Sequence, residues 1–147
     1  MPDSARPQAL DLGDFDAVGV VTSFVVALRG HAILADVDAV ATVNAPAGWH
    51  AVTVTARASG HVVLGVRYWQ LSSSRWHNVA AALEQRGWQA DENHEGATRT
   101  YPPGSEPTDA AFETLAALTV AGAPAVIRMV TAVDGRGTPV PIGSTDD

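Results

Sequence analysis

The sequence predicts a single α+β domain in which an antiparallel sheet of about five to six strands packs with three helices. Between residues 33 and 69, apolar and polar residues alternate along three segments, which is typical of half-buried antiparallel strands. Three other segments repeat their apolar residues every three or four positions and precede a glycine, as amphipathic helices do. A length of 147 residues suits one domain. We place it at residues 14–134, after a flexible arm at 1–13 and before a turn-rich tail at 135–147.

The first element, residues 14–29, fits either a helix or a strand. Asp14 and Gly30 bracket it as an N-cap and a stop signal. One side of the helix would carry the following residues: Phe15, Val18, Thr22, Val25, Val26 and Arg29. The valine content of AVGVVTSFVVAL would also suit a strand. We predict a helix, because its periodicity and its two bracketing residues agree.

Three strands follow at residues 33–43, 49–57 and 61–69. One face of them collects these apolar residues: Ile33, Ala35, Val37, Ala39, Ala41, Val43, Val52, Val54, Ala56, Val62, Leu64, Val66 and Tyr68. If Arg57 pairs with His61, a three-residue loop that ends in glycine joins the last two strands. That register aligns Val54 with Leu64 and keeps both apolar faces on the same side.

The second half predicts a helix, a hairpin, a helix and a last strand. In residues 72–88, Ser74 is the expected N-cap and Gly87 the stop, with an apolar stripe of Trp76, Val79, Ala80 and Leu83. The hairpin at 88–101 turns at residues 94–96, which sets Asp91 opposite Arg99. The next helix begins at Thr108 or Asp109, ends before Gly122 and carries a stripe of Phe112, Leu115, Leu118 and Thr119. Residues 124–133 form the last strand.

Composition excludes several classes of function. A net charge of −7 argues against nucleic acid, and the absence of a basic cluster argues against an anionic membrane. We find no 18-residue apolar span and no signal peptide, so we expect a cytoplasmic protein. The chain has no cysteine, and its five histidines form no metal-binding motif. We expect no metal, no cofactor and no catalytic residue.

Asp36 and Asp38 form a pair of carboxylates separated by one residue on one strand face. Both would lie on the solvated face of the first strand, where they could bind a divalent cation or share a proton. Extending the strand register across the NAPAG turn places Asp36 beside Arg57 and His61, and Asp38 beside Thr55. We therefore favour a row of cross-strand ion pairs over a cation or acid–base site.

Aromatic residues give the strongest indication of a binding surface. The strand register sets Trp49 opposite Trp69 on the face away from the valines, with Arg67 beside them. Tryptophan and arginine are enriched where proteins bind one another. The alternative is that a helix covers this face and makes the tryptophans a second core layer. Tyr68 belongs to the valine face, and Trp76 belongs to a helical stripe.

Three segments carry a resemblance to a known family: VAAALEQRGW at 79–88, TRTYPPG at 98–104 and TDAAFETLAALTVAG at 108–122. With the order of helix, three strands, helix, two strands and helix, they resemble the type III secretion chaperone-like superfamily. The resemblance implies a dimeric, non-enzymatic fold that holds a partner chain through an exposed sheet or helix face. It transfers no catalytic residue.

The first hypothesis for function is a partner-binding module that uses Trp49, Arg67 and Trp69, with Arg57 and Tyr68 nearby. The partner would be a protein or an apolar small molecule, and the module itself a homodimer. A second hypothesis is a cofactor-free enzyme or sequestering protein for a reactive metabolite, because all nine basic residues are arginine and no thiol is present. Its polar groups would be Arg67, Tyr68, Asp36 and His61. A third is an immunity-type inhibitor whose acidic surface binds a basic toxin.

Overall fold

The structure is a computed structural model that describes residues 8–11, 16–44, 50–68, 73–90, 96–121 and 127–142. Three helices run over these residues: α1 (Ala17–Ala35), α2 (Ser73–Gln85) and α3 (Pro107–Ala121). The seven strands are β1 (Gln8–Asp11), β2 (Ala39–Asn44), β3 (His50–Ala56), β4 (Val62–Tyr68), β5 (Gln89–Ala90), β6 (Gly96–Tyr101) and β7 (Ile127–Asp134).

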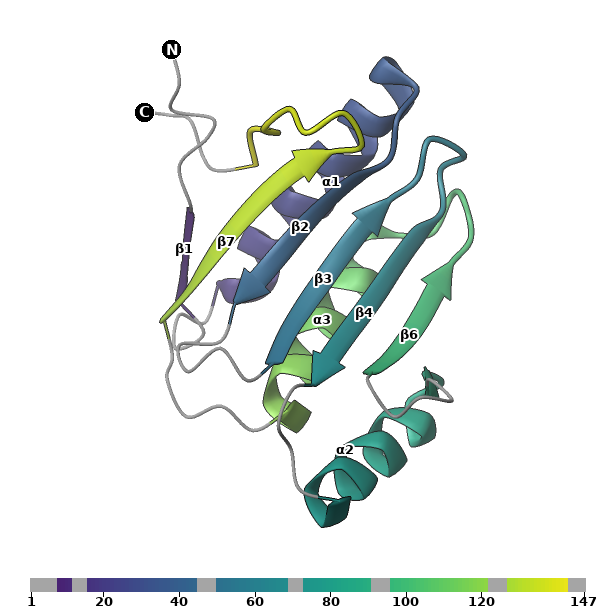
Figure 1. Cartoon of the computed structure of the whole chain (residues 1–147). Helices are drawn as coiled ribbons and strands as arrows, with labels where there is room; N and C mark the ends of the chain where they lie inside the picture. Colours follow the sequence, from purple (N-terminus) through teal and green to yellow (C-terminus); the bar gives the residue numbers. More distant parts are fainter. Residues whose placement is uncertain are drawn as a thin grey trace.

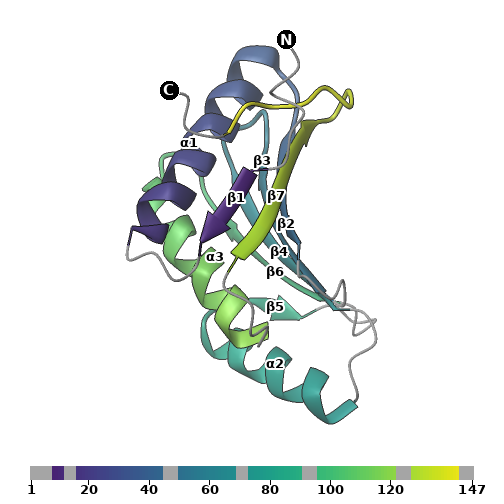
Figure 2. The ribbon, with the colours of Figure 1, turned by 90° about the vertical axis from the view of Figure 1, so that its left-hand side faces the viewer.

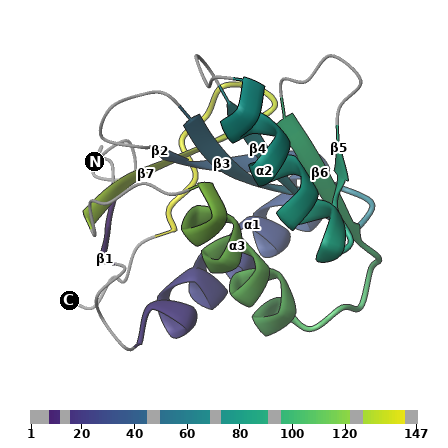
Figure 3. The same cartoon turned by 90° about the horizontal axis from the view of Figure 1, so that it is seen from below.

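The strands form one antiparallel sheet in the order β1-β7-β2-β3-β4-β6-β5 (Figure 1). Helices α1 and α3 lie side by side over one face of this sheet (Figures 2 and 3). Helix α2 lies at the lower end of the domain, next to α3 and β5. The opposite face of the five strands from β7 to β6 carries none of the three helices. The predicted α+β class and the predicted order of elements are confirmed, with β1 as an additional strand.

The core lies between the sheet and helices α1 and α3. Alternate sheet residues point into it, which is why the apolar positions of the strands recur with a period of two. The most deeply buried side chains include Leu28, Leu64, Leu83, Leu118, Val43, Val52 and Val66. The valine face predicted for residues 39–66 is therefore the buried face of the sheet.

Helix α1 confirms the helical interpretation of residues 17–29, but its end and its buried side differ from the prediction. The helix runs through Gly30 to Ala35, because Gly30 faces open space and a single glycine weakens a helix without ending it. It stops at Asp36, which has a left-handed φ of 55°. The buried side is made by Val21, Phe24, Val25, Leu28 and Ala32. Val26, expected on that side, is 53% exposed.

The longer helix shortens the first predicted strand, because β2 begins at Ala39 and not at Ile33. The β2–β3 register also differs from the prediction by two residues. Asp36 beside Arg57 would have set Asn44 opposite Trp49, but Asn44 pairs with Ala51. A shift of two residues keeps every side chain on its predicted face, so Ala39, Ala41 and Val43 are buried as expected. The β3–β4 register is as predicted, with Val54 opposite Leu64 and the Arg57 N–H donating to the His61 carbonyl at 2.9 Å.

The second hairpin has a different register from the predicted one. Gln89 pairs with Thr98 and Ala90 with Ala97, whereas Asp91 opposite Arg99 would have set Gln89 against Tyr101. The difference arises from Gly96, which was expected in the turn. Gly96 instead lies within β6 opposite Arg67. This position requires glycine, because a Cβ would collide with the carbonyl oxygen of Val66. Asp91 lies outside the described residues.

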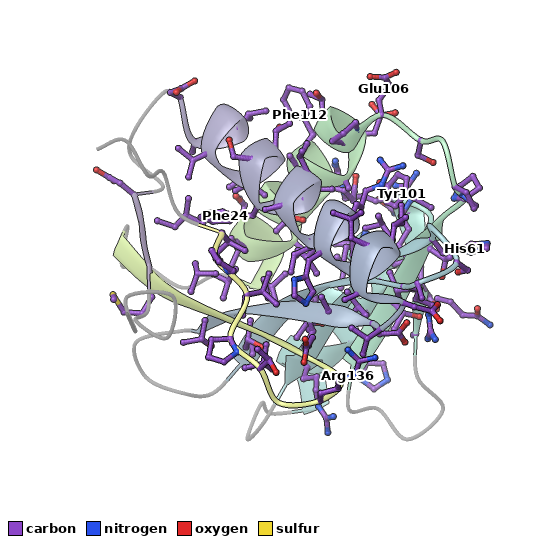
Figure 4. All side chains as sticks on the ribbon, turned by 90° about the horizontal axis from the view of Figure 1, so that it is seen from above. Phe24, His61, Tyr101, Glu106, Phe112 and Arg136 are labelled. Atoms are coloured by element: carbon purple, nitrogen blue, oxygen red, sulfur yellow. The ribbon has the colours of Figure 1, made fainter. Side chains whose placement is uncertain are left out.

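Helices α2 and α3 form where the sequence predicts helices, but the predicted apolar stripe of α3 is wrong at Phe112. Helix α2 begins one residue before Ser74, and Gly87 closes it at a φ of +91°. Helix α3 begins at Pro107, which suits a first helical turn. Its buried side is made by Ala110, Ala111, Glu113, Thr114, Ala117 and Leu118. Phe112, expected to be buried, is 58% exposed and points away from the sheet (Figure 4). The Trp76 side chain, Asp14, Gly122 and Pro124 lie outside the described parts of the chain.

Two segments expected at the periphery contribute to the domain. Residues 8–11, predicted as part of a flexible arm, form β1 against the first half of β7, and Leu10 is buried. Residues 138–142 of the predicted tail cover the second half of the same edge, where the Val140 N–H donates to the Ala132 carbonyl at 3.1 Å. Val140 and Ile142 are buried in consequence. The β7 edge is therefore protected against pairing with another chain.

Helix α1 also corrects the expectation that no apolar span of 18 residues exists. It has a mean hydropathy of 1.7 over such a window and lies near the N-terminus, so length and composition alone would allow it to cross a membrane. One third of that window is buried in the domain. The helix thus contributes one apolar side to the core and presents a second one outward.

Candidate functional site

The sheet face opposite the helices presents three rows of side chains. The strand registers set these rows across β7, β2, β3, β4 and β6. The first row is Val133, Val40, Thr55, Val63 and Thr100. The second row is Thr131, Thr42, Thr53, Gly65 and Thr98. The third contains Met129, Ala51, Arg67 and Gly96. Among the described elements, no helix lies over these rows, and we call this surface the uncovered sheet face.

The uncovered sheet face combines apolar side chains with hydroxyl groups. Met129 and Val133 are 45% and 40% exposed, although large apolar side chains on a sheet usually pack against another layer. The threonines at positions 98, 100 and 131 are exposed as well. None of the three rows contains an acidic residue, and Arg67 is their one charged side chain. This composition contrasts with the net charge of −7 of the whole chain.

Arg67 lies where the sequence placed it, exposed on this face and opposite Ala51 and Gly96. The register of β3 and β4 extends to the pair of His50 and Tyr68, of which the structure describes only the backbone. Trp49 directly precedes His50 and Trp69 directly follows Tyr68, and both tryptophans lie outside the described residues. None of the three helices lies over the described part of this face (Figure 2). The predicted alternative, in which the two tryptophans pack within the domain, falls on residues outside the described ones.

The other predicted site residues do not converge with Arg67. Asp36 ends helix α1, and His61 lies in the β3–β4 turn, where its Nδ1 is 2.9 Å from the Ser59 hydroxyl. Asp38, rather than Asp36, meets Arg57, with 3.6 Å between its Oδ2 and the Arg57 Nη1. This corrects the predicted ion-pair row by the same two residues as the strand register. Both partners are about half exposed, so their ion pair contributes little to stability.

A buried carboxylate that the sequence analysis did not identify lies on α3. Glu113 is 6% exposed and accepts hydrogen bonds from Arg86 at 2.7 Å and from the Trp88 indole N–H at 2.8 Å. The Arg99 Nη1 is 3.3 Å from its other oxygen, and the Arg99 guanidinium lies 5.0 Å above the centroid of the Tyr101 ring. Glu113 therefore joins the end of α2 to α3 and β6. If Phe112 is assigned to the outer side of α3, the helical period places Glu113 on the buried side with Ala110 and Ala117, and the sequence could have indicated this carboxylate in that way.

The charges around Glu113 determine its ionisation. Burial alone would raise the pKa of this carboxyl, but the hydrogen bonds from Arg86 and Trp88 and the charges of Arg86 and Arg99 outweigh burial and lower it. The same contact raises the pKa of Arg86. Burial raises the pKa of Tyr101, which keeps its phenol protonated beside Arg99. At neutral pH the cluster is thus an ionised carboxylate paired with two arginines. This arrangement stabilises the packing of the end of α2 and of β6 against α3.

A second unpredicted pair joins α1 to the turn after β7. The His31 Nε2 lies 2.9 Å from Oδ2 of Asp134, whose Oδ1 accepts the backbone N–H groups of Arg136 and Thr138. The hydrogen bond from His31 lowers the pKa of Asp134, and the two backbone N–H groups act in the same direction against burial. A separation of 103 residues leaves no local signal for such a pair. Asp134 shapes the turn that brings residues 138–142 back onto β7.

Within the described residues, no three histidine, aspartate or glutamate side chains lie close enough together to hold a metal ion. No protein-family model, no curated protein and no solved structure was found to match the chain. The uncovered sheet face is therefore the candidate that the geometry itself singles out.

Proposed function

We propose that this chain is a non-enzymatic binding module that holds a partner polypeptide on its uncovered sheet face. The observation that carries the proposal is the composition of that face: five strands wide, apolar and hydroxyl-bearing, and free of acidic residues in a chain of net charge −7. An interface core is depleted of charge in this way, and arginine is the cation most enriched there. The resemblance of the element order to secretion chaperone-like proteins points to the same kind of function.

The side chains also indicate the chemistry of the partner. Val40, Val63, Val133 and Met129 offer apolar area, and the threonine row between them offers hydroxyl groups that donate and accept hydrogen bonds. Arg67, at the lower end of β4, would pair with a carboxylate. The partner is thus an apolar segment or surface that carries an acidic group. A single arginine is too little positive charge for a nucleic acid.

The two other hypotheses receive less support. An enzyme or sequestering protein would need Arg67, Asp36 and His61 around one pocket, but they lie on the sheet face, at a helix end and in a turn. An inhibitor of a basic toxin would use acidic side chains. On the described surface, Asp36 and Glu106 flank helices, and Asp38 directly precedes β2, where it is paired with Arg57. None of these three residues belongs to the three rows of the uncovered sheet face.

Reversing the charge of Arg67 tests this proposal. We expect Arg67→Glu to weaken association with the partner at least about tenfold, which corresponds to about 1.4 kcal/mol, because a carboxylate would then face a carboxylate. Arg67 is exposed, so the melting temperature should stay close to that of the wild type. The measurement is quantitative mass spectrometry of proteins that co-purify with the tagged chain from its native host.

Arg136→Glu is the matched control, since it makes the same change of charge in the exposed turn beyond the other end of the sheet. A specific partner should be retained by this variant and lost from Arg67→Glu. Equal recovery of the same proteins with the wild type and both variants would show that the uncovered sheet face does not bind them.

A further inference from the structure

Helix α2 and strand β5 are joined by a short hydrogen-bonded turn, and we call them together the α2–β5 unit (residues 73–90). The Trp88 N–H donates to the Leu83 carbonyl at 3.0 Å. The Gly87 N–H donates to the Glu84 carbonyl at 3.1 Å, and Gly87 has a φ of +91°. These two bonds make the glycine-terminated turn that commonly ends a helix. Because the turn ties the first residues after α2 to its last turn, a displacement of α2 takes β5 with it.

Few apolar side chains pack the α2–β5 unit against the rest of the domain. Its main neighbours are α3 and β6, and it lies at the lower end of the domain rather than over the sheet (Figure 2). Its buried apolar side chains, in the described part of the unit, are Val79, Ala80, Leu83 and Trp88. Helix α1 alone buries six residues, and β5 adds only two residue pairs with β6. A segment with so few buried apolar contacts opens more readily than the core of the domain.

Polar contacts hold the unit at one place, the end of α2. Glu113 of α3 accepts hydrogen bonds from two nitrogens of Arg86, at 2.7 and 3.2 Å, and from the Trp88 indole N–H at 2.8 Å. From β6, the Arg99 Nη1 donates to the Arg86 carbonyl at 2.6 Å and lies 3.3 Å from Glu113. A single carboxylate thus receives three hydrogen bonds from the unit, so replacing it weakens all three at once.

We propose that the α2–β5 unit opens from the otherwise folded domain in one cooperative step, and that Glu113 is the contact that keeps it closed. The strands from β7 to β6 stay paired in the open state, and α1 and α3 keep their packing against the sheet and against each other, because none of these contacts involves the unit. The detached helix loses its structure, since a helix of 13 residues is marginal in water without tertiary contacts.

Opening changes one edge of the sheet. Once β5 is removed, β6 becomes the last strand from Gly96 to Tyr101, and its outer backbone N–H and C=O groups are unpaired beside Arg67. Unpaired edges of this kind pair with strands of other chains. At the opposite edge, β1 and residues 138–142 cover both halves of β7. The unit therefore regulates how much of the β6 edge is available. This opening does not depend on the binding function proposed above.

Native-state hydrogen exchange of the full chain at pH 7 tests the opening. The amides of residues 77–85, which are hydrogen-bonded within α2, are expected to exchange at least about tenfold faster, relative to their intrinsic rates, than the amides of β3 and β4. The Trp88 amide should exchange with the same opening free energy as the helix, because one step releases both. Exchange of the α2 amides at the level of β3 and β4 overturns the proposal, as does a gradient of opening free energies along α2.

Glu113→Gln tests the contact that keeps the unit closed. Its bonds to the unit are broken in the open state, so the substitution is expected to raise the exchange rate of the α2 amides at least about tenfold. Arg86→Gln weakens the same contact from the side of the unit and should act in the same way.

Asp134→Asn is the matched control, because it makes the same change of carboxylate to amide at the other end of the sheet. Its contact with His31 persists when the unit opens. It should therefore raise exchange in β3 and β4 by destabilising the whole domain, and leave the α2 amides unchanged. Equal acceleration of the α2 amides by Glu113→Gln and Asp134→Asn, or no acceleration by Glu113→Gln, overturns the proposal.

Discussion

Replacement of Glu113 by glutamine is expected to lower the free energy of unfolding by about 2–3 kcal/mol. Removing one partner of a buried ion pair typically costs 3–5 kcal/mol, because the remaining charge is left uncompensated. The loss here is smaller, since the side chains of Arg86 and Arg99 are 45% and 32% exposed and water can solvate them. Glutamine fills the same space and can still accept the hydrogen bond from Trp88. The measured change therefore reports the charge rather than a cavity.

The effect of this substitution should depend on pH. The folded-state pKa of Glu113 is lowered, so its contribution is fully present above the ordinary carboxyl pKa of 4.5 and disappears as pH falls through the lowered value. The wild type and Glu113→Gln should consequently approach one another in stability below pH 4.5. Asp134, whose pKa is also lowered, should make both proteins less stable in acid.

Urea unfolding, followed by circular dichroism at pH 7 and in acid, measures both effects. Glu106→Gln is the matched control, because Glu106 is exposed and points away from the domain (Figure 4). It should change stability by less than about 0.5 kcal/mol. Equal effects of the two substitutions at pH 7 would mean that the Arg86–Glu113–Arg99 cluster does not stabilise the fold.

Replacement of Gly96 by alanine is expected to destabilise the domain by at least about 3 kcal/mol, because the added Cβ clashes with the backbone of the neighbouring strand where β6 begins. The added Cβ would fall on the carbonyl oxygen of Val66, and neither strand can move without loss of β4–β6 hydrogen bonds. The same change should disturb Arg67, which is the direct partner of Gly96 in the register.

Gly65→Ala provides the comparison on the neighbouring strand. Its Cβ would lie 2.7 Å from the Thr53 hydroxyl, which can rotate away, so we expect a loss of less than about 1 kcal/mol. Thermal unfolding of the two variants measures the difference. Similar melting temperatures would contradict the close approach of β4 and β6 at Gly96.

Alternation of apolar residues made the central strands predictable from sequence. Val52, Val54 and Val66 each lie between polar or small residues, and the glycine of the three-residue turn left one register for β3 and β4. The β2–β3 register was not determined in the same way. A shift of two residues leaves the same faces buried, so the apolar pattern at Ala39, Ala41 and Val43 cannot distinguish the two alignments.

Tertiary contacts explain the remaining differences. Valines occur on every side of α1, so the sequence could not show that Val26 faces out and Val21 faces the core. The partners of Glu113 come from α2 and β6, and His31 meets Asp134 across most of the chain. Arg67 could be predicted because its face follows directly from the strand period. That the face is left uncovered depends on where the helices pack.

Site-specific photo-crosslinking in the native host is the most direct test of the uncovered sheet face as a binding surface. A photoreactive amino acid would replace Thr131 or Thr98, which are exposed at opposite sides of this face, and Gln85 on α2 as the control. The proposal predicts that both sheet positions form an adduct with the same protein, that Arg67→Glu in the same chain removes the adduct, and that Gln85 does not form it. No adduct from either sheet position, or an equal yield from Gln85, would contradict it.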